Sequence, residues 1–212
     1  MRISELAQAS GVAVPTIKYY LREGLLPPGR ATSATQASYD DGHLQRLQLV
    51  RSLVEVGGMP LAKVRAVLDV LEDPAPDPYT AVSEALAALP PYVSAGPPYE
   101  RATAALDEIG LAYEPSSYAV AQLEAALAGL EAAGRPLDAG ALGRYAEQMM
   151  VIARREVATV EAQRDPAVPA ELADVVQDVV LGTVLVEPVI LALRRLTHAA
   201  LFRERHPPGG AG

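Results

Sequence analysis

Prolines crowd the segment between residues 74 and 98, which holds seven of the chain's eighteen prolines. Proline lacks an amide hydrogen and its ring clashes with the preceding helical turn, so no long helix can cross this segment. The prolines therefore divide the 212 residues into a first part at 1–72 and a larger part beyond the cluster. We expect 73–98 to be a semi-rigid linker, with one short helix at Tyr79–Leu89.

Two short helices are expected near the start of the chain. Their ranges are Ser4–Ala9 and Pro15–Glu23, and a tight turn at Gly11 joins them. In the second helix, Ile17 and Tyr20 can face inward. The polar and basic side chains can then face outward, as in a helix that lies in a DNA major groove. These residues are Thr16, Lys18, Tyr19 and Arg22.

The remainder of the first part predicts a compact unit. Arg30–Ser38 is a polar segment expected to form a wing, either a short β-hairpin or an extended loop. Asp40 is a good N-cap for a third helix, which the two glycines at 57 and 58 end. Pro60 opens a fourth helix, whose apolar residues recur at helical spacing.

The second part also has helical patterns, so the fold class expected for the chain is all-α with a small β wing. Five helices are predicted, at Tyr99–Ile109, Ser117–Ala133, Asp138–Gln163, Ala170–Val186 and Pro188–Arg205. We assign 99–206 to one effector-binding and dimerisation domain. The tail at 207–212 is expected to be disordered.

These patterns identify the first 72 residues as similar to the MerR family of bacterial transcription regulators. The resemblance rests on ISELAQASGV, TIKYYLREGLLPP and SYDDGHLQRLQLVRSLVEVGGMPLAKVRAVL, and covers about a third of the chain. It implies a winged helix-turn-helix that binds double-stranded promoter DNA as a homodimer on a palindromic site. It further implies that activators distort the promoter so that RNA polymerase can engage it.

The resemblance also implies roles for single residues. Thr16, Lys18 and Tyr19 match DNA-facing positions of the recognition helix, and Arg22 lies near the phosphate backbone. Tyr39 matches a wing-end tyrosine that contacts a phosphate. The family often carries an arginine just before that tyrosine, but this chain has Gln-Ala-Ser, so Arg30 is the alternative phosphate contact.

Charge is unevenly distributed over the two parts. Residues 1–72 carry eight Lys and Arg against seven Asp and Glu, whereas 73–212 carry ten against nineteen. A nearly neutral DNA-binding part on an acidic body predicts modest affinity unless two copies bind together. The prolines exclude a long dimerisation helix directly after Leu71. The helix at Asp138–Gln163 is the best replacement, and the apolar C-terminal helix pair is the competing dimer surface.

The body has features of a small-molecule sensor. Seven of the ten aromatic residues lie in it, and tyrosine combines an apolar ring with a hydroxyl that can bind organic molecules. Glu187 stands in the apolar run VLVEPVIL, where it could pair with a cationic ligand or with a nearby arginine. The residues proposed as ligand contacts are Tyr113, Tyr145, Met149, Glu187 and His198.

Several classes of protein and site are not expected. The chain has no cysteine and only three scattered histidines, which excludes disulfides and disfavours metal sites. We find no catalytic motif and predict no cofactor and no enzyme activity. The apolar run Val179–Leu193 has about fifteen residues, short of the roughly 20 of a membrane span. We therefore expect a cytoplasmic protein that does not bind membranes, with a buried helix pair at this run.

Two other functions remain open for the body. It could bind a protein partner, or only dimerise, while the DNA-binding part stays the same. It could instead sequester a toxic compound such as an antibiotic, a reading that rests on analogy alone.

Overall fold

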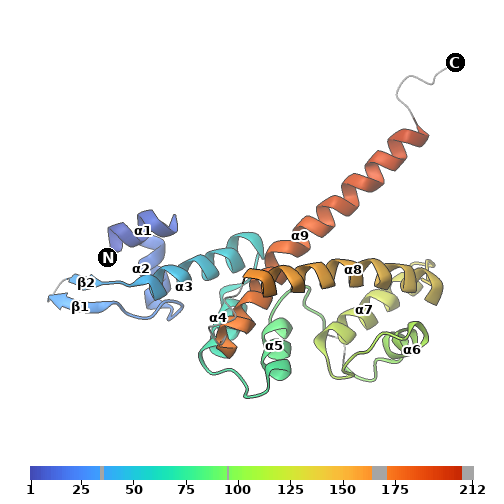
Figure 1. The fold of residues 1–212 in the computed structure, drawn as a ribbon, viewed down its shortest axis with the longest axis horizontal. Helices are drawn as coiled ribbons and strands as arrows, with labels where there is room; N and C mark the ends of the chain where they lie inside the picture. Colours follow the sequence, from blue (N-terminus) through green and yellow to red (C-terminus); the bar gives the residue numbers. More distant parts are fainter. Residues whose placement is uncertain (34–35, 95, 164–170, 207–212) are drawn as a thin grey trace. The chain divides into compact units, whose positions relative to one another are not determined.

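The computed structural model describes residues 1–33, 36–94, 96–163 and 171–206 (Figure 1). Helices dominate these residues, and a two-stranded sheet completes them, which confirms the expected all-α class with a small β wing. The chain divides into two compact units. We call Met1–Leu68 with Val179–Gly212 the head unit, and Asp69–Asp178 the body unit. The expected disordered tail lies outside the described residues.

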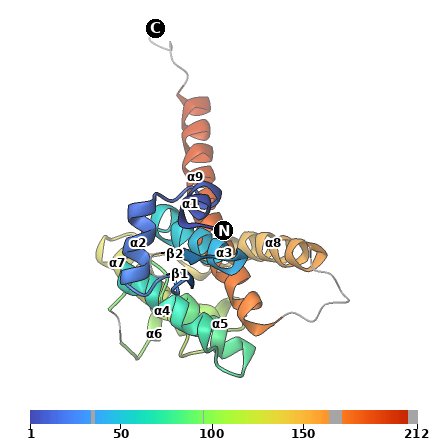
Figure 2. The same ribbon diagram turned by 90° about the vertical axis from the view of Figure 1, so that its left-hand side faces the viewer.

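The head unit begins with a helix-turn-helix and a wing (Figures 1 and 2). Its elements are α1 (Ile3–Ser10), α2 (Val14–Arg22), β1 (Arg30–Ser33), β2 (Gln36–Ser38), α3 (Asp41–Arg51), a π-helical turn η1 (Ser52–Val56) and the first residues of α4 (Leu61–Glu72). The two strands are antiparallel, with Arg30 opposite Ser38 and a register shift between Ala31 and Ser33. The sequence predicted these elements to within a few residues, except that η1 extends the third helix.

The core of the head unit forms because each helix carries apolar residues at helical spacing. Leu6 of α1, Ile17 of α2, Leu47 of α3 and Val64 of α4 are all fully buried. α1 packs against both α2 and α3, so the helix-turn-helix rests on the third helix. Full burial of a leucine or isoleucine contributes about 1.5–3 kcal/mol, which makes this core the main support of α2.

The body unit consists of three helices of ten to fifteen residues and one of 25 residues around a small core, together with the end of α4 and the start of α9. Its helices are α5 (Pro78–Ala87), α6 (Glu100–Ile109), α7 (Tyr118–Ala132) and α8 (Ala139–Gln163). α6 packs on both α7 and α8, and α5 packs on α7. Ala102, Leu106 and Val120 form the buried cluster between α6 and α7. The helix predicted between the proline clusters is thus α5, and it belongs to the body unit.

A buried carboxylate ties α6 to α7. Glu124 accepts a hydrogen bond of 2.9 Å from the Ala102 amide and one of 3.0 Å from Arg101, which also contacts Glu131 at 2.7 Å. Desolvation raises the pKa of the Glu124 carboxyl, but the bonds from Ala102 and Arg101 outweigh it and leave the pKa lowered. The buried charge of Glu124 is therefore paired and hydrogen-bonded, and its role is to hold α7 against the start of α6.

The C-terminal region forms a single helix, α9 (Leu172–Arg205), although Pro188 lies inside it. The expected pair of helices broken at this proline is wrong. Proline removes one backbone hydrogen bond, but most residues after it are Leu, Ala and Arg, which favour helix. Val176, Val180 and Val184 are buried on one face of its first half. Beyond them the helix is largely exposed, so the expectation of a buried helix pair is also wrong.

By length and composition, α9 is a helix that could cross a membrane, and it alone meets that test among the described residues. The sequence argument against a membrane span is that the apolar run Val179–Leu193 has only about fifteen residues, short of the roughly 20 that a span needs. A continuous helix of 34 residues removes that argument.

Candidate nucleic-acid interface

α2 separates its residues into a buried face and an exposed face. Ile17 is fully buried and Tyr20 nearly so, which fixes the helix on the head core. Burial raises the pKa of the Tyr20 hydroxyl, and nearby Glu55 and Tyr19 raise it further. The predicted DNA contacts on this helix all lie outside that core, with Thr16 half-buried. They are Thr16, Lys18, Tyr19 and Arg22.

The turn before α2 depends on Gly11. This residue has a φ of 68°, a left-handed conformation that favours glycine. A Cβ atom there would lie 2.7 Å from the guanidinium of Arg51, which donates a hydrogen bond of 3.3 Å to the Ser10 carbonyl. Arg51 of α3 therefore holds the turn in place, and the turn sets the angle between α1 and α2.

Two further arginines fasten the segment after α2. Arg46 of α3 donates a hydrogen bond of 3.0 Å to the carbonyl of Leu25, and Arg65 of α4 donates one to the carbonyl of Glu23. With Arg51, three of the head's basic side chains thus bind backbone carbonyls. The exposed cations of α2, Lys18 and Arg22, remain on its outer surface.

The aromatic and cationic groups of the outer face also contact each other. The guanidinium of Arg22 lies over the ring of Tyr19, 5.2 Å from its centre. A cation over an aromatic face is attracted by the ring quadrupole, which limits the directions that Arg22 can take. The two side chains therefore present one combined surface of a ring, a hydroxyl and a guanidinium.

The wing places its two predicted contacts differently. Arg30 opens β1 and is exposed, as a phosphate contact requires. Tyr39 follows β2 and is only 7% exposed, with its ring edge against His43 at 5.2 Å between centres. Its backbone amide also donates to the Met1 carbonyl at 2.8 Å. The phosphate contact of Tyr39 stays a prediction. In the structure its ring packs against His43 in the core of the head unit.

Directly after the wing, Asp40 and His43 cap the first turn of α3. Asp40 accepts a hydrogen bond of 3.1 Å from the His43 amide, as its expected N-cap role requires, and the two side chains are 2.5 Å apart. The His43 side chain and then its backbone amide lower the pKa of the Asp40 carboxyl. His43 is buried, and its Nε2 lacks a hydrogen-bond partner among the described residues.

The two units carry opposite charge. The head unit holds twelve Lys and Arg against seven Asp and Glu, a net charge of +5. The body unit holds six against nineteen, a net charge of −13, and the two values together give the chain's −8. This contrast is larger than the sequence division predicted, for two reasons. Asp69 and Glu72 fall in the body unit, and the segment from Val179 onward brings four arginines but only two glutamates to the head unit. A net positive unit is what a phosphate backbone attracts.

The five predicted ligand contacts lie in different segments of the chain, three in the body unit and two in the head unit. Tyr113 packs on the α6–α7 core, and its hydroxyl donates a hydrogen bond of 2.9 Å to Asp107, which raises the tyrosine's pKa. Tyr145 and Met149 lie one turn apart on α8, where both are exposed. Glu187 and His198 lie on the exposed part of α9. Desolvation by its surroundings raises the pKa of the Glu187 carboxyl.

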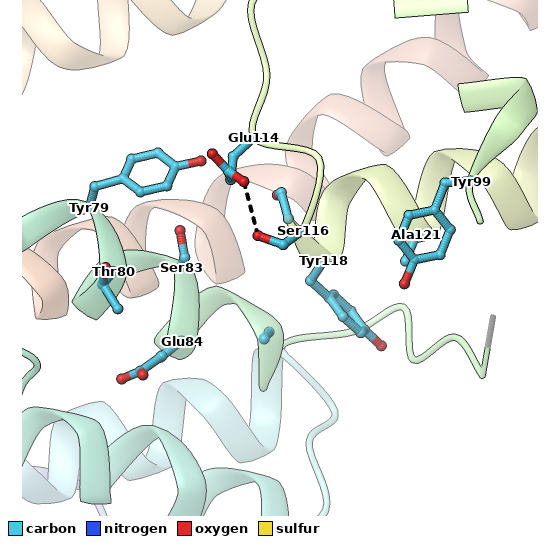
Figure 3. Close-up of a pocket in the computed structure, with 11 residues that line it drawn as sticks. Tyr79, Thr80, Ser83, Glu84, Tyr99, Glu114, Ser116, Tyr118 and Ala121 are labelled. Carbon is cyan, nitrogen blue, oxygen red and sulfur yellow. Dashed lines mark hydrogen bonds between the residues drawn. The ribbon is translucent and has the colours of Figure 1, made fainter. Parts of the chain in front are cut away.

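Sequence reasoning missed an open cleft in the body unit, which we call the α5–α7 cleft (Figure 3). Its volume is about 470 Å³. α5, the start of α6, the loop before α7 and α7 itself supply its walls. Its polar and aromatic lining residues are Tyr79, Thr80, Ser83, Glu84, Tyr99, Glu114, Ser116, Ser117 and Tyr118. The concentration of tyrosines in the body was the signal, but it pointed to Tyr113 and Tyr145, which lie elsewhere.

Metal chemistry finds no support in the described part of the chain. No three His, Cys, Asp or Glu side chains there come close enough together to hold a metal ion. The candidate functional surfaces are thus the outer face of α2, the wing and the α5–α7 cleft.

Comparisons with known proteins support the interpretation of the head. Residues 1–71 match the model of the MerR HTH family regulatory proteins. The regulator described as a ZntR homolog in Haemophilus influenzae is 36% identical over 70 residues, which are 33% of this chain and 51% of that protein. MerD of Shigella flexneri is 39% identical over 72 residues, 33% of this chain and 60% of that regulator. The chain thus matches about half the length of these relatives.

One solved structure extends the similarity over the whole chain. It is the crystal structure of a protein described as a transcriptional regulator, SCO5550 from Streptomyces coelicolor A3(2). The identity is 36%, the TM-score is 0.73, and the alignment covers 97% of this chain and 98% of that one. With its helix-turn-helix at residues 1–71, the chain belongs to the MerR family of DNA-binding transcription regulators.

Proposed function

We propose that the protein controls transcription by binding a palindromic promoter site as a homodimer and that its body responds to a small organic ligand. The observation that carries the proposal is the geometry of α2, which buries Ile17 and Tyr20 and exposes Lys18, Tyr19 and Arg22. Its site of action is the cytoplasm, away from membranes, and RNA polymerase is an indirect partner at the promoter.

In the proposed complex, α2 lies in the major groove. Lys18 donates to guanine edges or phosphates, Thr16 reads base edges, and the Tyr19 hydroxyl donates to a phosphate. Arg22 and Arg30 bind the phosphate backbone on either side of the groove. Phosphate contacts fix the orientation of the protein on the duplex, while the contacts to base edges supply sequence preference.

Lys18→Ala tests this arrangement. We expect promoter affinity to fall several-fold and the log–log salt slope to decrease by about 0.9 if Lys18 contacts a phosphate. Fluorescence anisotropy of a labelled promoter fragment over a series of salt concentrations measures both quantities. Arg135→Ala removes an equal charge from an exposed position of the body unit and serves as the matched control. Unchanged binding by Lys18→Ala would contradict the role of α2.

The exposed part of α9 supports the homodimer. Leu185, Val189 and Leu196 are 39%, 53% and 64% exposed, and Ala192 and Ala199 continue their spacing of four and three residues. Apolar residues with this spacing form the seam along which two helices pair in a coiled coil. These side chains are exposed to solvent in the single chain, and pairing with α9 of a second copy would bury them.

α8 remains the rival dimer helix. It is 25 residues long and also exposes apolar side chains. They are Tyr145, Met149, Met150, Val151, Val157 and Val160. α6 already covers part of α8, while the second half of α9 is exposed along its length. We therefore favour α9 as the dimer helix.

A further inference from the structure

We propose that the α5–α7 cleft binds an organic cation, a compound with a protonated or quaternary amine beside an aromatic or aliphatic group. The inference rests on the proposed function, since it names the chemical class of ligand to which the body would respond. The cleft volume of about 470 Å³ lies in the range of small-molecule sites, about 300–1,000 Å³.

Three tyrosines line the cleft from three parts of the body unit. Tyr79 comes from α5, Tyr99 precedes α6, and Tyr118 is the first residue of α7. In Figure 3 the ring of Tyr79 lies on one side, and Tyr99 and Tyr118 lie on the other. Aromatic faces attract cations through the ring quadrupole, and several rings around one space are a typical arrangement for quaternary amines.

The position of Tyr118 is fixed by hydrogen bonds. Its hydroxyl accepts a bond of 2.8 Å from the Val93 amide and donates one of 3.4 Å to the Pro91 carbonyl. Gln122, one turn later on α7, donates a bond of 2.9 Å to the same carbonyl. The hydroxyl is therefore used within the protein, and the ring is what Tyr118 offers to a ligand. Side chains held in place before binding lose less entropy when a ligand arrives.

Glu114 is the carboxylate that points into the cleft. Its side chain and the hydroxyl end of Tyr79 point toward each other across the cleft in Figure 3, and it accepts a hydrogen bond of 3.1 Å from Ser116. Glu84 also lines the cleft, and its side chain points away from Glu114 in Figure 3. Neither carboxylate has an ion-pair partner among the described residues. A cation near Glu114 would supply that partner.

The charge of the surroundings favours a cation over an anion. None of the lining residues is a lysine, arginine or histidine. The body unit as a whole has a net charge of −13, so its field attracts cations to the cleft and repels anions. The buried Ala121 and half-buried Ala87 add apolar surface between the polar groups. The cleft thus combines rings, apolar wall and negative charge.

Direct binding of three probes of similar size tests the proposal. They are benzyltrimethylammonium as the cation, benzyl alcohol as the neutral compound and 3-phenylpropionate as the anion. Calorimetry with the full chain should detect the cation alone. The chain has no tryptophan, so tyrosine fluorescence provides a second readout. Binding of the neutral or anionic probe as tightly as the cation would overturn the proposal.

Substitutions locate the binding. Glu114→Gln and Tyr79→Leu should each weaken the cation at least about fivefold, through loss of the charge or of a ring. Tyr79 is 57% exposed, so its replacement leaves the core intact. Glu156→Gln on exposed α8 removes an equal charge outside the cleft and should leave binding unchanged. Equal loss in all three variants would overturn the assignment to the cleft.

Promoter binding by the same preparation separates this proposal from the proposed function. If benzyltrimethylammonium does not bind while the protein still binds promoter DNA, the proposed cation site is wrong and the proposed DNA-binding function is unaffected. If the cation binds with the expected variant pattern while promoter DNA is not bound, the DNA-binding proposal fails alone. A change in promoter affinity when the cation is added would support both.

Discussion

At the scale of single residues, Gly57 occupies a position where no larger side chain has room. A Cβ atom there would lie 2.7 Å from the carbonyl oxygen of Leu53 and 2.9 Å from a methyl group of Val184. One neighbour is backbone and the other a buried valine of α9, so neither yields easily. This glycine lets the end of η1 meet α9 inside the head unit.

Gly57→Ala should therefore destabilise the head unit by about 1–3 kcal/mol, the usual cost of overpacking. Urea denaturation followed by circular dichroism measures the change. Gly129→Ala is the matched control, because it lies inside α7 with no atom within 4 Å of the added carbon. The control should stabilise by about 0.5–1 kcal/mol. Equal stability of Gly57→Ala and the parent would contradict the packing of Val184 on Gly57.

Asp40 should make the head sensitive to acid. A carboxyl with a lower pKa in the folded state stabilises the fold above its unfolded pKa, and this stability is lost as pH falls through the folded pKa. Stability should therefore decrease below about pH 4, where free aspartate titrates. Asp40→Asn should flatten this decrease in urea midpoints measured across pH.

The neighbouring Asp41 provides the control for that experiment. Its carboxylate lies in the same helical turn but makes no hydrogen bond among the described residues. Asp41→Asn should keep the acid sensitivity of the parent. Identical pH profiles for the two variants would show that the Asp40–His43 contact does not set it.

At the scale of elements, dimerisation through α9 and dimerisation through α8 predict different effects of mutation. Leu196→Glu places a charge on the proposed seam of α9 and should convert the dimer into a monomer in sedimentation experiments. Val157→Glu places the same charge on exposed α8 and should leave the dimer intact. The reverse pattern would assign dimerisation to α8. Loss of the dimer in both variants would mean that each helix contributes.

At this scale the sequence predicted most helices and the wing, because capping residues, prolines and apolar spacing act locally. Asp40 begins α3, and the prolines around α5 confine it to ten residues. The predicted break at Pro188 is wrong because the effect of a proline on a helix depends on the residues around it. The buried valines before it and the helix-favouring residues after it keep α9 continuous. η1 was missed, since a local shift to wider hydrogen bonding leaves no clear sequence pattern.

At the scale of the whole molecule, the two units should lose stability separately. Glu124→Gln removes the charge that binds the Ala102 amide and Arg101, and should cost the body unit about 1–3 kcal/mol. Hydrogen exchange read by mass spectrometry should show faster exchange in α6 and α7 and unchanged exchange in α1 to α3. Glu131→Gln, at the exposed end of the same network, should have a smaller effect. Uniformly faster exchange would indicate that the two units unfold together.

The helix-turn-helix, the wing, the family resemblance and the acidic body could all be predicted from the sequence, because each depends on residues close together in the chain. Tertiary structure decided what distant residues do. It placed α9 from Val179 onward with the head unit and Asp69 and Glu72 with the body unit, which together give the head unit a charge of +5. It also buried Tyr39 against His43. It also separated Tyr113 and Tyr145 from the cleft that Tyr79 and Tyr118 line. A site made by several elements depends on how those elements pack, which local pattern does not specify.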